Sequence, residues 1–199
     1  MAAKDRAAQA DLFASGLPEG FAYREDVLSQ AQEADAVRRF EALPFKPFEF
    51  GNYVGNRRVV SFGWRYDYAG RALRESAPVP EFLHEMRDTA ASFAAIAASS
   101  LQQVLVTEYA PGAGIGWHRD KPMFEDVLAF SFCASCRLRF RRKRGDGWDR
   151  ATVTVAPRSL YLLRGPARWG WYHSIPAHAA LRYSVTFRNF KAAGPEARG

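Results

Sequence analysis

The sequence predicts a mainly β domain of the α+β class, built on a double-stranded β-helix, or two-sheet jelly roll, with supporting helices on one side. The first observation is that short apolar, β-rich runs recur between turn signals along the second half of the chain. These runs lie at Val104–Val106, Leu128–Cys133, Cys136–Arg142, Thr152–Val155, Leu160–Leu163 and Arg182–Phe190. The second is that only two segments have the apolar spacing of amphipathic helices. Many short strands with few helices are typical of such a two-sheet fold.

Length and composition indicate one domain with a basic surface. The 199 residues, 48% of them hydrophobic, are enough for one substantial core. The net charge of +7 and the pI of about 9.7 favour a polyanionic partner such as DNA or RNA. An arginine-rich composition without functional meaning is the alternative. The two cysteines are too few for a disulfide framework.

No targeting or membrane-spanning segment is expected. No apolar run reaches the length that spans a bilayer. The N-terminal sequence MAAKDRAAQADLF contains acidic residues and has no apolar centre, unlike a signal peptide. We therefore expect a cytoplasmic monomer with no membrane partner, in a reducing compartment.

The N-terminal part of the chain predicts an arm, a short strand and a helix. Residues 1–20 are expected to form a flexible arm, because glycine and proline interrupt the end of this segment. Phe21–Tyr23 is a candidate strand. Ser29 and Gln32 have the spacing of a capping box, and the apolar periodicity behind them predicts a helix over Gln30–Ala42.

Two further segments precede the first long strand. Pro44–Tyr68 is rich in aromatic and basic residues, and Val59–Tyr68 within it is strand-like. Pro80–Ser99 predicts a helix that packs on the sheet, because apolar residues recur there at every third or fourth position.

A basic hairpin is predicted around residue 145. Cys136–Arg142 alternates strictly between apolar residues and arginines, so Arg137, Arg139 and Arg141 share one face. With the basic run before the turn, the hairpin presents up to six basic side chains, which favours a phosphate-binding face. A solvated charged strand is the alternative. Cys133 and Cys136 would point to opposite faces of a strand and are expected to be structural.

The candidate metal site centres on His118 and Asp120. In an extended segment, side chains two residues apart point to the same face, so the imidazole and the carboxylate can converge on one ion. His173 is the candidate third ligand. It alternates with Trp169 and Trp171, which predicts that the two indoles share its strand face and that Trp171 shapes the metal pocket. His178 is the rival third ligand, but it lies in a turn.

This set of residues suits a particular oxygen chemistry. Two imidazoles and one carboxylate hold Fe(II) on one face of an octahedron and leave three positions open. Two positions suit a 2-oxo acid such as 2-oxoglutarate, and the third suits O2. Arg182 and Arg188, an even number of residues apart on one strand, can offer charge-assisted hydrogen bonds to the far carboxylate. Taken singly, each residue also fits an ordinary surface or strand position.

Three segments resemble the AlkB family of Fe(II)/2-oxoglutarate dioxygenases. They are YAPGAGIGWHRDK from Tyr109, the segment Trp171–Ile175, and RYSVTFR from Arg182, and the resemblance extends over roughly residues 43–190. It implies a single dioxygenase domain over residues 21–190, followed by a tail over residues 191–199. It also implies that His118, Asp120 and His173 are the iron ligands and the catalytic centre.

The resemblance assigns the cosubstrate pocket as well. Arg182 corresponds to the arginine that pairs with the distal carboxylate of 2-oxoglutarate, and Arg188 to a second arginine of that pocket. Tyr109 corresponds to a tyrosine that touches the cosubstrate. Thr107 and Ser184 stand where the best-known bacterial member has asparagine, and both can still donate hydrogen bonds.

The substrate implied by the resemblance is an N-alkylated base in single-stranded DNA or RNA, which the enzyme would oxidatively dealkylate. Residues 44–79 would form a nucleotide-recognition lid over a flipped base. Candidate substrate contacts are the aromatic residues Tyr53, Trp64 and Tyr66, for stacking, and Arg57 and Arg58, for phosphate. The alternative is that these aromatic side chains fill the core of a small hairpin.

Two other functions remain open. Pro122 stands where the best-known bacterial member has an acidic residue, which leaves room for the same oxygenase chemistry on a protein or a small molecule. A non-catalytic jelly roll that binds nucleic acid is the third hypothesis.

Overall fold

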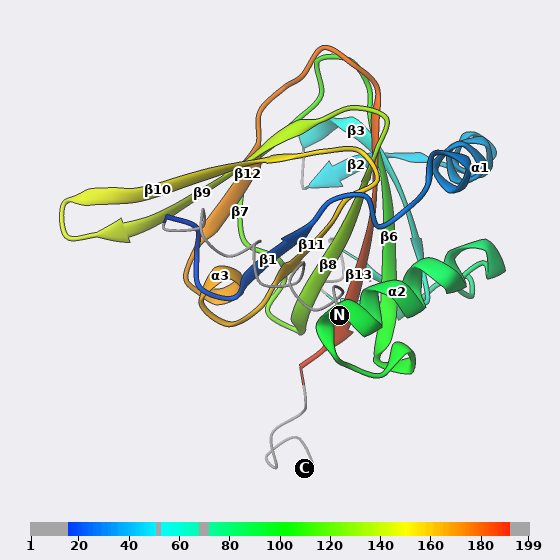
Figure 1. Cartoon of the computed structure of the whole chain (residues 1–199), viewed down its shortest axis with the longest axis horizontal. Coiled ribbons are helices and arrows are strands. Elements are labelled where there is room, and N and C mark those ends of the chain that lie inside the picture. The colour runs from blue at the N-terminus through cyan, green and yellow to red at the C-terminus, as the bar shows by residue number, and fades with distance from the viewer. Residues whose placement is uncertain (1–15, 51–52, 68–71, 192–199) are drawn as a thin grey trace, which may run out of the picture.

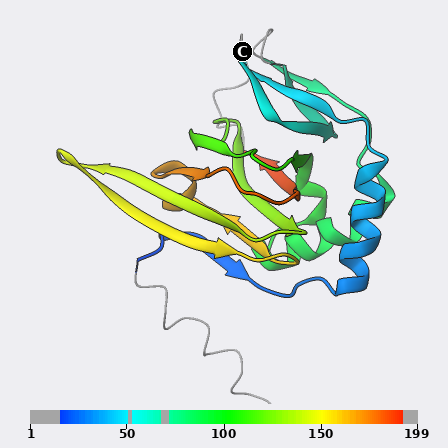
Figure 2. The ribbon, with the colours of Figure 1, turned by 90° about the horizontal axis from the view of Figure 1, so that it is seen from above.

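A computed structural model describes residues 16–50, 53–67 and 72–191 of the chain. Most of the predicted arm and nearly all of the predicted tail therefore lie outside the described residues. Two antiparallel sheets form the body of the molecule, as the sequence predicts, and helices α1 and α2 lie on one side of it (Figures 1 and 2). None of the described helices is long and apolar enough to cross a membrane.

The large sheet has seven strands in the order β1-β11-β8-β13-β6-β3-β2. Its strands are β1 (Phe21–Arg24), β2 (Lys46–Phe50), β3 (Tyr53–Phe62), β6 (Leu101–Tyr109), β8 (Phe124–Phe132), β11 (Leu160–Leu163) and β13 (Arg182–Phe190). The small sheet has four strands in the order β10-β9-β12-β7. Its strands are β7 (Ile115–His118), β9 (Cys136–Arg144), β10 (Gly147–Val155) and β12 (Tyr172–Ile175). A separate pair joins β4 (Trp64–Asp67) and β5 (Ala72–Glu75).

The period-two alternation of the large sheet divides the apolar residues into two cores. On the outer face, the sheet packs against α1 (Gln30–Glu41) and α2 (His84–Ala94), and the fully buried ring of Phe40 contacts Phe132 edge to face at 5.1 Å. On the inner face, side chains such as Val127 and Leu163 pack against the small sheet. The space between the two sheets is therefore where polar residues on these strands can meet.

The predicted capping box of α1 is confirmed. The backbone N–H of Ser29 donates to Gln32 Oε1 at 2.8 Å, and the backbone N–H of Gln32 donates to Ser29 Oγ at 3.2 Å. Both groups would otherwise lack partners at the first turn of the helix.

Replacing Ser29 by alanine is expected to lower the free energy of unfolding by about 1 kcal/mol, because one capping hydrogen bond is lost. Urea unfolding followed by circular dichroism measures this loss. Ser29→Asp keeps an acceptor at the cap and should retain most of the wild-type stability. Equal midpoints for wild type and Ser29→Ala would show that the cap contributes nothing.

Helix α2 is shorter than the Pro80–Ser99 segment that the apolar periodicity predicts. A single 3-10 turn over Glu81–Leu83 precedes it, and Ala95 ends it in a left-handed conformation with φ of 53°. The N–H of Ala95 closes the last turn onto Ala91 O and Ser92 O. Periodicity does not reveal such a stop, because alanine is normally a good helix former.

The predicted alternation of Trp169, Trp171 and His173 along one strand is wrong. A short helix, α3 (Gly165–Trp169), occupies the first part of this segment, and β12 begins only at Tyr172. Pro166 stands in the first turn of this helix, where its missing N–H costs nothing. Trp171 is buried in the core between the sheets and does not line the metal pocket.

The predicted basic hairpin is confirmed and is longer than the sequence indicates. Strands β9 and β10 pair without a break from Cys136 to Arg144, and the apolar residues of β9 are buried while the arginines point outward. Cys136 is buried at the start of β9, whereas Cys133 is exposed in the turn before it, so the two cysteines do not share a strand as the sequence prediction assumes.

The strand-like segment Val59–Tyr68 forms parts of two strands that meet at Gly63. This glycine has φ of +71°, and a Cβ atom there would lie 2.0 Å from the backbone oxygen of Gln102. Only glycine allows this close approach, which separates β3 from β4.

Candidate active site

The three predicted metal ligands come together between the two sheets. His118 ends β7 and His173 lies on β12, where the two residues are direct partners across the antiparallel pair. Their ring centroids are 4.2 Å apart, and Asp120 follows two residues after His118. One ligand atom from each of the three side chains lies within 4.8 Å of the others. Among the described residues this is the one such group of histidine, cysteine and carboxylate side chains.

The geometry of these atoms fits a single ion. His173 Nε2 lies 3.4 Å from Asp120 Oδ2. Two ligands that bind one ion at right angles, each at about 2.1 Å, are separated by about 3 Å. His118 donates from Nδ1 to the backbone oxygen of Gly116 at 2.9 Å, which leaves its Nε2 as the nitrogen that can bind a metal.

The local electrostatics keep His118 and Asp120 in their metal-binding forms. Burial and the neighbouring His173 lower the pKa of His118 to about 4, so the imidazole is neutral at physiological pH. Burial alone would raise the pKa of Asp120, but Arg188 and His173 together hold it well below its usual range. A neutral imidazole beside a charged carboxylate is the donor set that Fe(II) requires.

Arg188 holds the metal-binding carboxylate in place. Its Nε and Nη2 donate to Asp120 Oδ1 at 3.0 and 2.6 Å, and its Nη1 donates to Gln103 Oε1 at 2.8 Å. The second carboxylate oxygen of Asp120 is the one that faces His173. The residue assigned to the cosubstrate pocket on resemblance therefore contacts an iron ligand directly, from a position on the wall of the same cleft.

The environment of Arg182 favours the binding of an anion. The residue is fully buried, and its Nε donates to Ser131 Oγ at 3.0 Å. Its Nη1 and Nη2 are also buried and have no hydrogen-bond partner among the described residues. A buried guanidinium with two unsatisfied nitrogens is costly unless an anion pairs with it. A carboxylate can pair with both nitrogens in bidentate form, as expected of the distal carboxylate of 2-oxoglutarate.

Strand register surrounds Arg182 with the other predicted cosubstrate residues. Arg182 on β13 lies opposite Tyr109 on β6, and its guanidinium carbon is 5.0 Å from the centre of the tyrosine ring. Two residues further along β13, Ser184 lies opposite Thr107 on β6. Tyr109, Thr107 and Ser184 all line the cleft that contains the three metal ligands.

Two residues of the site do not figure in the sequence predictions. Ser131, the acceptor for Arg182, lies inside the apolar run of β8, and Gln103, the acceptor for Arg188, lies on β6. The sequence does contain a hint of each residue's role. Ser131 is the one hydroxyl residue of the apolar, buried strand β8, and Gln103 lies on the same strand face as Thr107 and Tyr109.

The cleft around the site has a volume of about 1080 Å³. Of the predicted substrate contacts, Arg57 and Tyr66 line it, and the nearby Lys121 places Nζ 4.3 Å from the Tyr66 ring centre. Trp117 and Arg119, which flank His118, line it as well.

The other predicted substrate contacts lie elsewhere. Trp64 packs edge to face on Phe190 at 5.8 Å and is not among the residues that line the cleft. Arg58 makes two hydrogen bonds of 2.7 Å to Glu108 and is also outside the cleft lining. Tyr53 opens β3, and its side chain is outside the described part of the chain.

The rival histidine is not a ligand in this arrangement. His178 Nδ1 donates to the backbone oxygen of Ala180 at 2.7 Å, and the ring lies 6.0 Å from that of Tyr109. It does not belong to the group of converging ligand atoms.

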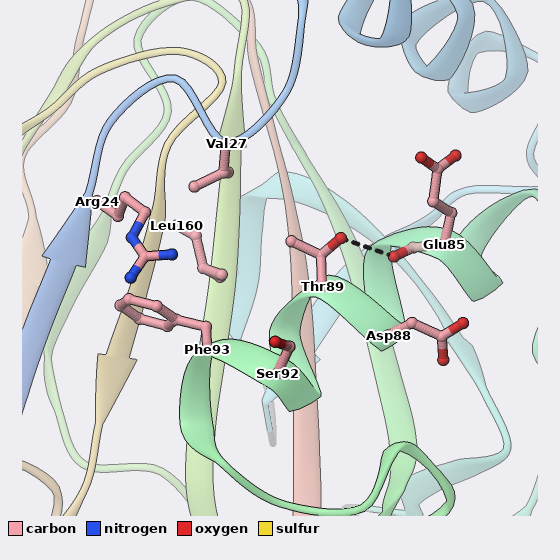
Figure 3. A pocket seen from close by; sticks show the side chains of 8 residues that line it. All are labelled: Arg24, Val27, Glu85, Asp88, Thr89, Ser92, Phe93 and Leu160. Atoms are coloured by element: carbon pink, nitrogen blue, oxygen red, sulfur yellow. Dashed lines mark hydrogen bonds between the residues drawn. The ribbon is translucent and has the colours of Figure 1, made fainter. Parts of the chain in front are cut away.

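A second hollow, of about 370 Å³, lies on the helix side of the large sheet (Figure 3). Arg24 stacks on Phe93 there at 4.9 Å, and the hydroxyl of Thr89 donates to the backbone oxygen of Glu85 at 2.9 Å. These polar groups are satisfied locally, and the hollow contains none of the metal ligands. The cleft between the sheets is therefore the candidate functional site.

Comparison with known proteins agrees with this geometry. The family model described as "2OG-Fe(II) oxygenase superfamily" matches residues 20–188. The "Alkylated DNA repair protein ALKBH8 homolog" of Arabidopsis thaliana is 28% identical over 149 residues, which cover 63% of this chain and 43% of that protein. The "tRNA (carboxymethyluridine(34)-5-O)-methyltransferase ALKBH8" of Mus musculus is 25% identical over 177 residues, covering 80% of this chain and 24% of that protein. The chain thus spans less than half the length of these relatives.

The fold has a close counterpart among solved structures. The chain described as "The structure of OsALKBH1" aligns with a TM-score of 0.66 and 17% sequence identity, over 87% of this chain and 97% of that chain. Fold, converging ligands and buried arginine point to the same class of enzyme. The chain belongs to the 2OG-Fe(II) oxygenase superfamily, in which it is a dioxygenase of AlkB type that uses Fe(II), 2-oxoglutarate and O2.

Proposed function

We propose that this dioxygenase oxidatively removes alkyl groups from the nitrogen atoms of bases in DNA or RNA. The observation that carries the proposal is the composition of the cleft wall next to the metal ligands. The flat aromatic ring of Tyr66 lies there with two cationic side chains, Arg57 and Lys121. Rings can stack on a base that has left its helix, and cations can pair with its phosphates.

The size of the cleft supports the same substrate class. Its volume of about 1080 Å³ slightly exceeds the range of roughly 300–1,000 Å³ that is usual for one small ligand. It therefore has room for 2-oxoglutarate and for a second organic group beside the metal ligands.

The chain's own residues have distinct tasks in this reaction. His118, Asp120 and His173 would hold iron, and Arg188 fixes the carboxylate of Asp120 through two hydrogen bonds. Arg182 would bind the distal carboxylate of the cosubstrate and so orient it. When bound, iron and 2-oxoglutarate supply the activation of O2 and the hydroxylation of the alkyl carbon, which then leaves the base as an aldehyde.

Residues 44–79 are proposed to act as the lid over the target base. Strand β3 brings Arg57 to the cleft wall and β4 brings Tyr66. A lid that closes on the base would exclude water from the reacting carbon. The residues that line the cleft lie within residues 21–190, which we propose to form a single dioxygenase domain that acts as a monomer.

The names of the relatives support a nucleic-acid substrate without choosing the polymer. One is named for the repair of alkylated DNA and the other for a modified uridine of tRNA. The competing function is the same chemistry on a protein or a small molecule. It is favoured by Pro122, an exposed residue next to Lys121 that has no side chain able to hydrogen-bond to a base.

Mass spectrometry of methylated oligonucleotides tests the proposal. Short single-stranded DNA and RNA carrying N1-methyladenine or N3-methylcytosine are incubated with enzyme, Fe(II), 2-oxoglutarate and ascorbate. Loss of one methyl mass with wild type but not with Asp120→Ala is expected, and the faster polymer identifies the preferred substrate. Formation of succinate with no change in any oligonucleotide would instead support a protein or small-molecule substrate.

A further inference from the structure

The outward face of the small sheet is unusual in its chemistry. Strand register places Arg141 opposite Tyr172 and Arg139 opposite Ser174. Arg139, Arg141 and Tyr172 are partly exposed on the face away from the core, where Arg139 Nε donates to the buried Ser174 Oγ at 3.1 Å. Strands β7 and β10 add further residues to this face. We call it the arginine–tryptophan face, and it consists of Trp117, Arg119, Arg139, Arg141, Trp148 and Tyr172.

Aromatic rings surround the guanidinium groups of this face. The guanidinium carbon of Arg141 lies 4.5 Å from the ring centre of Trp117, 4.5 Å from that of Trp148 and 5.7 Å from that of Tyr172. Arg119 lies 4.3 Å from the Tyr172 ring. Such cation–π contacts hold planar cations in fixed positions without neutralising them.

The two faces of the β9–β10 hairpin differ in how their arginines are paired. Asp149 lies on the other face, where its carboxylate pairs with Arg142 at 2.9 Å and with Arg144 at 3.5 Å. Among the described residues, no carboxylate forms an ion pair with Arg119, Arg139 or Arg141. The positive charge of the arginine–tryptophan face is therefore uncompensated and available to an anion.

This face continues into the active-site cleft. Trp117 and Arg119 belong to the face and also line the cleft on either side of His118. At its other end, the β9–β10 hairpin projects from the body of the molecule (Figures 1 and 2). Trp148, on this hairpin, is 39% exposed even though Arg141 and Tyr172 pack beside its ring.

We propose that the arginine–tryptophan face binds the single strand of nucleic acid that flanks the target base. Its guanidinium groups would contact successive phosphates, and the exposed ring of Trp148 would stack on a base. Planar cations interleaved with aromatic rings are the pattern of surfaces that bind single strands without sequence preference. The proposal rests on the proposed function, because it extends the substrate site from one base to the neighbouring strand.

Fluorescence anisotropy with the full chain and an unmodified, labelled 20-nucleotide DNA or RNA single strand tests this surface. Trp148→Ala and Arg141→Gln are each expected to weaken binding by about tenfold, and Arg141→Gln should also reduce the salt dependence by about one counterion. Trp148→Phe keeps an aromatic ring and should retain most of the affinity. Arg38→Gln is the matched control, since Arg38 is an exposed arginine on α1 that pairs with Asp35.

The outcomes separate this inference from the proposed function. Binding that depends on Trp148 and Arg141 supports the surface even if no methylated base is turned over. Binding equally strong in Trp148→Ala, Arg141→Gln and Arg38→Gln would overturn the surface, whether or not the enzyme demethylates oligonucleotides. Equal competition by polyglutamate of the same charge would also overturn it, because a general polyanion site needs no stacking ring. Thermal unfolding of each variant verifies that the fold is intact.

Discussion

Replacing Asp120 by alanine is expected to abolish turnover and to prevent tight binding of Fe(II). The substitution removes the carboxylate of the metal group and leaves two imidazoles, which hold iron poorly. Loss of a residue that merely supports a metal ligand costs about 10- to 100-fold in metal affinity or activity, so loss of the ligand itself should cost more than about 100-fold. Iron content after anaerobic loading and the rate of succinate formation measure the two effects.

The Asp120→Ala experiment needs two control variants. The substitution also strips Arg188 of its carboxylate partner and leaves it with Gln103 alone, so the variant is expected to be less stable. Asp120→Asn preserves the shape and separates loss of charge from loss of fold. Asp35→Ala removes an exposed carboxylate on α1 and should behave as wild type. Activity retained by Asp120→Ala with controlled metal content would refute the ligand assignment.

Replacing Arg182 by methionine is expected to raise the KM for 2-oxoglutarate by at least about 30-fold while iron still binds. Truncating one partner of a buried, hydrogen-bonded charge pair costs about 2–5 kcal/mol, which corresponds to roughly 30-fold or more in affinity. Arg182 is fully buried and its two terminal nitrogens have no partner among the described residues, so both are expected to pair with the carboxylate when the cosubstrate binds. Steady-state kinetics with varied 2-oxoglutarate measure the change.

Thermal unfolding gives an independent test of Arg182. Without the cosubstrate, the wild-type protein keeps an unpaired buried guanidinium, so Arg182→Met should be as stable as wild type or more stable. Adding 2-oxoglutarate with iron should raise the Tm of wild type and leave that of the variant unchanged. Arg38→Met removes an exposed guanidinium and should respond as wild type does. A wild-type KM together with a wild-type Tm response in Arg182→Met would contradict the assigned role.

Local patterns in the sequence predict much of this arrangement of side chains. The two-residue spacing of His118 and Asp120 predicts that both side chains converge, and their ligand atoms lie within 4.8 Å of one another in the structure. Strand β13 begins at Arg182 and ends at Phe190, as its alternation predicts. The outward arginines of β9 follow from the same period of two.

The features that sequence patterns miss depend on contacts between distant segments. Arg188 and Asp120 are 68 residues apart in the chain, and no periodicity reveals that their side chains bond. Ser131 and Arg182 are joined across 51 residues in the same way. Trp171 alternates with His173 in sequence, but the short helix α3 before it changes its direction and buries it in the core.

The composition of the proposed lid, residues 44–79, also predicts the contacts of its side chains only in part. Its composition indicates aromatic and basic contacts, but the structure distributes them among different surroundings: Tyr66 and Arg57 line the cleft, whereas Trp64 packs on Phe190. Trp64 and Tyr66 lie only two residues apart on β4, so the difference comes from the distant residues that each ring meets, Phe190 for Trp64 and Lys121 for Tyr66. Such contacts between distant segments are a tertiary property that residue types alone do not determine.

The measurement that tests the central claim most directly is the coupling of cosubstrate to product in one reaction. Succinate and demethylated base are quantified together for wild type, Asp120→Ala and Arg182→Met on the same methylated oligonucleotide. The account predicts nearly one succinate per methyl group removed by wild type, with both products lost in Asp120→Ala and strongly reduced in Arg182→Met at low 2-oxoglutarate. Methyl loss that persists in both variants, or succinate without methyl loss from any methylated oligonucleotide, would contradict it.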